Sequence, residues 1–133
     1  MTFSIQVFIT SFIIIAVIDI PVISQIMSPM WKKMIFKIQQ APMVLNKHYA
    51  LIAYFFLALA LSVFSIPNIR NTNILGDSIY YGGILGLVIY GIFDFTNLAL
   101  LQNYNLRIGI IDTLWGGILL ATCSYIVKKI NNN

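Results

Sequence analysis

The chain has 133 residues, of which 59% are hydrophobic and only 9% are charged, whereas about 25% of residues are charged in an average soluble domain. So few charges cannot cover the surface of a soluble domain, so the composition predicts an integral membrane protein with a single domain. The net charge of +4 comes from eight Lys and Arg against four Asp. No basic soluble surface is available for nucleic acid, so the expected partner is the lipid bilayer, whose headgroups attract such basic residues.

Four segments are long and apolar enough to be membrane spans, since a spanning helix needs about 20 mainly apolar residues. They cover approximately residues 3–26, 48–66, 78–101 and 106–127. The first lacks a basic leading region and a small-residue cleavage site, which indicates a retained span rather than a removable signal peptide. Because the connections are short, consecutive spans run antiparallel. The expected fold class is therefore all-α, an integral membrane four-helix bundle.

The connection between the first two spans is bracketed by Pro29 and Pro42 and has the pattern of a short helix. Its apolar residues follow helical spacing, and its polar residues lie on the opposite face. The apolar set is Trp31, Met34, Ile35 and Ile38, and the polar set is Lys33, Lys37 and Gln40. This pattern predicts a short interfacial helix lying in the headgroup plane. An irregular basic loop is the alternative.

The distribution of basic residues indicates an orientation in the membrane. An even number of spans places both termini on one side, together with Arg70, Lys128 and Lys129. The other side carries Lys32, Lys33, Lys37, Lys47 and Arg107. By a small margin, the positive-inside rule then predicts a cytoplasmic first connection and both termini outside.

Three of the four aspartates lie inside spans and at one depth. Asp19 is near the end of the first span, Asp94 near the end of the third, and Asp112 near the start of the fourth. Because the spans alternate in direction, all three approach the same membrane face, at about 10 Å below it. Asp77 lies in the loop on the opposite side. Intramembrane ionisable groups are costly and are functional by default, so this layer is the candidate site.

Small residues on the last two spans predict how these helices pack. On the third span, one stripe along the helix consists of Gly83, Gly86, Tyr90, Asp94 and Asn97. On the fourth span, the facing stripe consists of Gly109, Asp112, Gly116 and Cys123. Small residues let helices approach closely in lipid. The predicted polar cluster is therefore Asp19, Tyr90, Asp94, Asn97, Asp112 and Trp115. Lys33, Lys37 and Arg107 are expected at the headgroup level or at the mouth of this cluster.

The same stretch of the chain resembles a family of small predicted membrane proteins, a domain-of-unknown-function family found mostly in bacteria. The resemblance is carried by an aromatic-Asp-x-Thr-Asn-Leu-Ala run and by an Asp followed shortly by Trp-Gly. The matching positions are Gly86, Tyr90, Gly91, Asp94, Thr96, Asn97, Leu98, Ala99, Asp112, Trp115 and Gly116. Asp19 matches the family's intramembrane Asp in the first span, whereas Pro21 departs from the pattern. The resemblance implies a four-span fold and supplies no mechanism.

Three functions fit these residues. The preferred hypothesis is cation- or proton-linked permeation or transport of a small solute by a homo-oligomer, because four short spans enclose little space. The second is a membrane-embedded lipid-binding or lipid-modifying protein, and the third is a structural or assembly protein whose polar cluster only holds the helices together. No Ser-His pair, zinc-protease motif or phosphate loop occurs, which favours a protein that is not an enzyme and has no cofactor. No metal site is assigned, although Asp19, Asp94 and Asp112 together would offer oxygen ligands for one.

Overall fold

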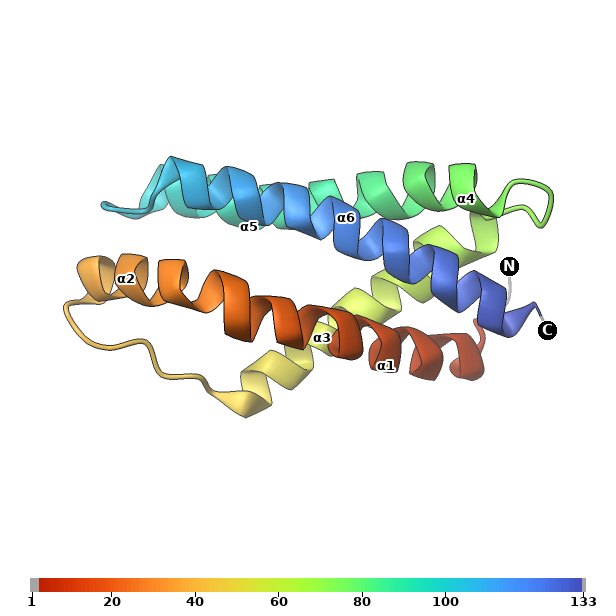
Figure 1. The fold of residues 1–133 in the computed structure, drawn as a ribbon, viewed down its shortest axis with the longest axis horizontal. Coiled ribbons are helices and arrows are strands. Elements are labelled where there is room, and N and C mark those ends of the chain that lie inside the picture. Colours follow the sequence, from red (N-terminus) through yellow and green to blue (C-terminus); the bar gives the residue numbers. More distant parts are fainter. Residues whose placement is uncertain (1–2, 133) are drawn as a thin grey trace.

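The computed structural model describes residues 3–132, and this part of the chain is helical with no strand (Figure 1). The α-helices are α1 (Ile5–Val22), α2 (Ser28–Gln39), α3 (Lys47–Ala60), α4 (Ile74–Asp77), α5 (Ile84–Leu100) and α6 (Leu106–Asn131). Wider π-helical turns extend or join these helices without a break at Ile23–Met27, Leu61–Ser65 and Ser78–Gly83. A short 3-10 turn, Ile66–Asn68, ends the second span. An all-α bundle is therefore confirmed.

The connected helices form four long segments that match the predicted spans. They run over Ile5–Gln39, Lys47–Asn68, Ile74–Leu100 and Leu106–Asn131, and each is long and apolar enough to cross a membrane. Two of them begin at asparagine caps. The Asn46 side chain accepts a hydrogen bond from the backbone N–H of His48 at 3.1 Å, and that of Asn105 accepts one from Ile108 at 3.1 Å. Such caps satisfy backbone groups that the first helical turn leaves free.

The helices lie side by side, with the two ends of the chain at one end of the bundle (Figure 1). The loop before α4 lies at that same end, whereas α2 and the connection between α5 and α6 lie at the other. Helices α5 and α6 form a tight hairpin, and α1 packs on both α3 and α6. The buried core between them is built mainly of aliphatic side chains: Ile15, Ala58, Leu61, Ile66, Ile69, Leu119, Leu120 and Val127, with Cys123 among them.

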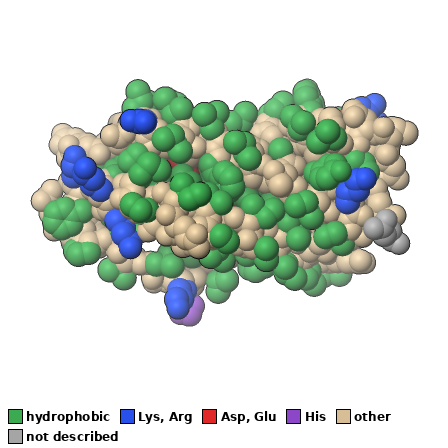
Figure 2. Space-filling view, viewed as in Figure 1, with side chains coloured by type: hydrophobic (Ala, Val, Ile, Leu, Met, Phe, Trp, Pro, Cys, Tyr) green, Lys and Arg blue, Asp and Glu red, His purple; other side chains and the backbone are tan. Residues whose placement is uncertain are grey.

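The outer surface has the character expected in a bilayer. On the face shown in Figure 2, hydrophobic side chains cover the middle of the molecule, and Lys and Arg gather toward the two ends. Apolar residues that a soluble protein would bury are exposed here, among them Ile9, Ile13, Phe56, Val88 and Ile118. This distribution places the hydrocarbon around the middle of the bundle and the basic residues toward the headgroups.

The helix predicted between Pro29 and Pro42 is present as α2, but it continues α1 instead of forming a separate element lying across the bundle (Figure 1). Pro21 sits inside α1 just before the π-helical turn. Proline removes a helical hydrogen bond and crowds the preceding turn, and a wider turn accommodates this while the helix continues. The apolar face of α2 meets protein, since the Trp31 ring lies 6.4 Å from Phe93 and 6.0 Å from Tyr104.

Glycines set the spacing of α5 and α6, as the stripes predicted. Any side chain at Gly86 would meet the backbone carbonyl of Gly116, and any side chain at Gly116 would meet the ring of Tyr90. Backbone thus contacts backbone at this point, which only glycine permits. The close approach brings Asp94 of α5 opposite the first turns of α6, where Asp112 lies.

Candidate functional site

Asp19 joins three helices through its carboxylate. The side chain is 1% exposed and accepts the Tyr54 hydroxyl of α3 at 2.8 Å on one oxygen. Its other oxygen accepts the indole Nε1–H of Trp115 in α6, also at 2.8 Å. Both carboxylate oxygens therefore have a neutral donor from a different helix, so this aspartate is satisfied without any cation.

Asp94 is held in the same manner but at the α5–α6 hairpin. It is fully buried, and one oxygen accepts the hydroxyl of Tyr104 at 2.7 Å. The other accepts the hydroxyl of Thr113 at 3.1 Å. Tyr104 belongs to the short connection between the two helices, and Thr113 to the second turn of α6. Both donors to Asp94 thus come from the same α5–α6 hairpin as the carboxylate itself.

Asp112 is the second buried carboxyl group of the hairpin, at 8% exposure, and its carboxyl group lies within hydrogen-bonding contact of Asp94. We call these two residues the carboxyl pair. Two carboxylates in contact repel each other strongly where water is scarce. Asp112 is close enough to interact electrostatically with Asp94 and with Asp19, and Tyr90 is close to both Asp112 and Asp19. The three acids therefore lie in one region of the bundle, which we call the layer, although their hydrogen-bond donors differ.

The structure brings some of the predicted cluster together and separates the rest. Asp94 and Asp112 meet as expected, and Asn97 reaches the Tyr104 hydroxyl beside them. Trp115 donates to Asp19 and not to the pair. Within residues 3–132, no group of three or more His, Cys, Asp or Glu is placed to hold a metal ion. The metal site considered for Asp19, Asp94 and Asp112 is therefore not formed, because Asp19 is oriented toward Tyr54 and Trp115.

Of the four donors to Asp19 and Asp94, Trp115 was in the predicted cluster, whereas Tyr54, Tyr104 and Thr113 were not predicted from the sequence. Tyr54 lies in an apolar span, and Tyr104 lies in the short connection between the last two spans. Thr113 follows Asp112 directly, and both reach Asp94 because the glycines bring α5 and α6 unusually close. A tyrosine at the same depth as an intramembrane aspartate is the signal that would have identified the first of these donors.

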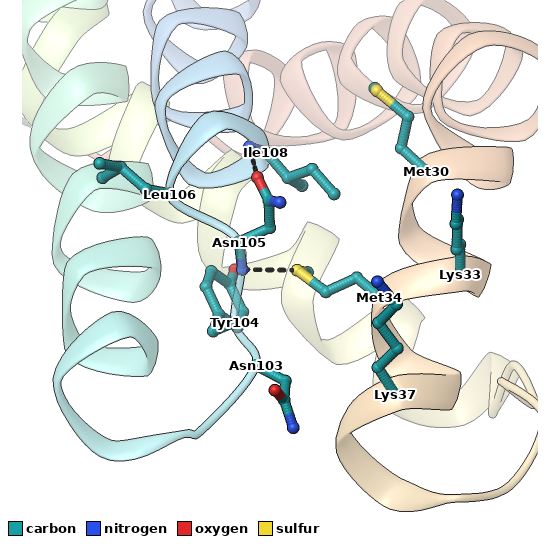
Figure 3. A pocket seen from close by; sticks show the side chains of 9 residues that line it. All are labelled: Met30, Lys33, Met34, Lys37, Asn103, Tyr104, Asn105, Leu106 and Ile108. Atoms are coloured by element: carbon teal, nitrogen blue, oxygen red, sulfur yellow. Dashed lines mark hydrogen bonds between the residues drawn. The ribbon is translucent and has the colours of Figure 1, made fainter.

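A cleft opens beside the carboxyl pair at the α2 end of the bundle (Figure 3). We call it the α2 cleft; its volume is about 520 Å³, and α2 forms one wall while the connection into α6 forms the other. The lining residues are Met30, Lys33, Met34, Lys37, Asn103, Tyr104, Asn105, Leu106 and Ile108. Two of the three basic residues expected at the mouth, Lys33 and Lys37, do line it, whereas Arg107 is exposed outside it.

Tyr104 connects the cleft to the carboxyl pair, because it lines the cleft and donates its hydroxyl to Asp94. Burial, together with the neighbouring Asp94 carboxylate, raises the pKa of the Tyr104 hydroxyl. The hydroxyl therefore stays protonated at physiological pH and remains a hydrogen-bond donor. Tyr104 is therefore in contact with both the cleft and the buried acids.

Arg70 and Asp77 form an ion pair at the opposite end of the bundle. The guanidinium binds both carboxylate oxygens, with Nη2 at 2.8 Å from Oδ1 and Nε at 2.9 Å from Oδ2. It is the sole ion pair among the described residues. Asp77, the fourth aspartate, is thus paired with a cation at a loop. The three aspartates in the layer instead contact neutral hydrogen-bond donors or another carboxyl group of the layer.

Fold and site together define a multi-pass α-helical membrane protein with a layer of buried carboxyl groups near one end. The family model described as "Predicted membrane protein (DUF2177)" matches residues 4–128, and the chain belongs to this family. The family has no assigned function, in agreement with the resemblance noted on the sequence. No curated protein and no solved structure matches the chain.

Proposed function

We propose that the protein carries out proton-linked permeation or transport of a small solute as a homo-oligomer, with the carboxyl pair as its proton-binding group. The single observation that carries this proposal is the contact between Asp94 and Asp112 inside the bundle. Placing one ionised Asp in a membrane helix costs about 2.5 to 3.5 kcal/mol. A packing contact alone needs only an amide, so two acids in contact at this cost favour a functional role.

The chemistry of the pair favours a proton over a metal cation. Two carboxyl groups in contact act as one titrating unit and readily share a proton between them. Tyr104 and Thr113 donate to the two Asp94 oxygens, and Asp112 lies against the same carboxyl group. Hard divalent cations instead take about six or more oxygen ligands, more than two side chains provide.

The position of the pair supports exchange with one side of the membrane. Tyr104 contacts both the pair and the α2 cleft, so the cleft is the expected route between the pair and one side of the membrane. The interior of the bundle is filled by the aliphatic core on the far side of the layer. A solute path through the remaining depth is therefore expected between subunits, which is the reason for an oligomer.

Proton flux into proteoliposomes that enclose a pH-sensitive dye tests the proposal, with a potassium gradient and valinomycin as the driving force. Asp94→Asn, Asp112→Asn and the double variant are each expected to abolish most of the flux that the wild-type protein shows. Asp77→Asn serves as the matched control, because it removes an aspartate at the opposite end and should leave the flux unchanged. Unchanged flux in a monodisperse Asp94→Asn/Asp112→Asn variant would remove the pair from the mechanism.

Asp19 has a different role in this proposal. Donors from α3 and α6 occupy both of its oxygens, which favours the structural function for this residue alone. An Asp19→Asn variant should fold less stably and, once folded, conduct as much per molecule as the wild type. Loss of flux in a fully folded Asp19→Asn variant would instead include Asp19 in the proton path.

A further inference from the structure

We propose that the α2 cleft is a binding site for an anionic phosphate group. Lys33 and Lys37 lie four residues apart on α2, which places them on one face of the helix. Both residues line the cleft, and their side chains run along its α2 wall (Figure 3). No acidic side chain lines this cleft, so its two ammonium groups have no partner there and its potential is positive.

The wall opposite the lysines offers further donors. Asn105 uses its side-chain oxygen to cap α6, accepting the Ile108 N–H at 3.1 Å, which leaves its amide NH₂ free to donate. Asn103 adds a second exposed amide on the same wall. Its φ of 66° is in the left-handed region, which Asn tolerates better than most residues and which makes the tight turn into α6. Ammonium and amide donors on the two walls of one cleft suit an oxygen-rich anion.

The remaining lining is mainly apolar, and one of its residues, Met34, is held by both walls. Met34 is 3% exposed, and its sulfur accepts the Asn105 backbone N–H at 3.2 Å, which holds the two walls together. Met30, Leu106 and Ile108 complete the apolar part. The volume of about 520 Å³ is within the range of small-molecule sites, about 300 to 1,000 Å³. Both a lipid headgroup and a free phosphate present the chemistry that this cleft would recognise.

This inference goes beyond the proposed function, because it requires neither flux nor a shared proton. It rests on the charge and shape of the α2 cleft, and the carboxyl pair is not part of it. Variants at Lys33 and Lys37 can therefore lose binding while proton flux persists, and variants at Asp94 and Asp112 can lose flux while binding persists.

Calorimetric titration of the purified full-length protein tests the site with three probes: dioctanoyl phosphatidic acid, inorganic phosphate, and dioctanoylglycerol, which lacks the phosphate. The wild type is expected to bind the phosphatidic acid and not the dioctanoylglycerol. Lys33→Gln/Lys37→Gln should raise the Kd about tenfold, equivalent to about 1.4 kcal/mol. Lys33→Arg/Lys37→Arg should retain binding, because the charge and the donors remain.

The matched control is Lys32→Gln/Lys47→Gln, which removes the same net charge from two lysines outside the cleft and should leave the Kd unchanged. Binding of the phosphatidic acid alone would identify a lipid headgroup as the ligand, and comparable binding of inorganic phosphate would identify a soluble anion. Equal weakening in the two double Gln variants would overturn the proposal, since the effect would then follow net charge. So would absence of binding by the wild type to both phosphate probes.

Discussion

Trp115 of α6 donates its indole N–H to Asp19 of α1 at 2.8 Å, although the two residues are 96 positions apart. With the Tyr54 hydroxyl on the other oxygen, this bond ties the N-terminal helix to both of its neighbours at one depth. Helices in lipid gain nothing from hydrophobic association with one another, so such polar ties and close packing hold the bundle together.

Trp115→Phe is expected to destabilise the bundle by about 1 to 2 kcal/mol, because one oxygen of the buried Asp19 loses its donor. Tyr54→Phe should have a similar effect, and the double variant should cost less than the sum if the two donors share one carboxylate. Thermal unfolding followed by circular dichroism in detergent measures this. Trp31→Phe is the control, since that ring contributes aromatic packing at α2. An equally large loss in this control would point to ring volume and not to the hydrogen bond.

The glycine contact between α5 and α6 predicts opposite results at two neighbouring positions. Gly86→Ala is expected to cost about 1 to 3 kcal/mol, because the new methyl group meets the backbone of Gly116, which cannot move aside. At Gly83 the nearest atom would be the Ala121 Cβ at 3.6 Å, an ordinary contact. Gly83→Ala should therefore be neutral or stabilising by up to about 1 kcal/mol, through the higher helix propensity of alanine. Equal thermal stability of the two variants would contradict this packing.

Tyr104→Phe separates the hydrogen bond to Asp94 from the packing of the ring. Asp94 then keeps the Thr113 hydroxyl but loses that of Tyr104, so proton flux should change and stability should fall by about 1 kcal/mol. Tyr80→Phe, at an exposed ring outside the layer, is expected to behave like the wild type.

The direction of the Tyr104 pKa shift predicts how the stability difference between the wild type and Tyr104→Phe depends on pH. Burial raises the pKa of Tyr104 in the folded protein, so its contribution is fully present below the unfolded tyrosine pKa of about 10 and is lost only as the pH rises toward the folded value. The stability gap between wild type and Tyr104→Phe should thus stay constant from about pH 6 to 9. A gap that closed within that range, measured by thermal unfolding, would show that another group titrates with it.

The orientation predicted from the basic residues is open to direct measurement. In a Cys123→Ala background, Thr72→Cys should react from outside intact cells with a membrane-impermeant maleimide, and Ala41→Cys should react only after the cells are opened. Both positions are exposed and lie at opposite ends of the bundle, while the native Cys123 is fully buried. The reverse pattern of labelling would place α2 and its cleft outside the cell.

The sequence predicted the spans and the α5–α6 contact because both depend on local regularities: a run of apolar residues, and small residues recurring at one face of a helix. It did not predict the donors Tyr54, Tyr104 and Thr113. Tyr54 and Asp19, for example, are distant in sequence, and only the packed bundle shows that they meet. The helix between Pro29 and Pro42 was predicted correctly. The prediction that it lies in the headgroup plane was wrong, because α2 continues in line with α1. Amphipathic spacing shows which face is apolar without showing whether protein or lipid covers it, and here Trp31 packs on Phe93 and Tyr104.

The length of the unbroken helix from Ile5 to Gln39 can be compared with the thickness of a bilayer. Its 35 residues span about 52 Å at 1.5 Å per residue, whereas the hydrocarbon core of a bilayer is about 30 Å thick. The part that ends at Met27 is already about as long as that thickness, so we expect α2 to extend about 18 Å farther, past the acyl chains and through the phosphate plane of one leaflet. In that position the α2 cleft would face both the lipid phosphates and the adjoining water, and we expect membrane-bound and dissolved anions to compete for the same two lysines.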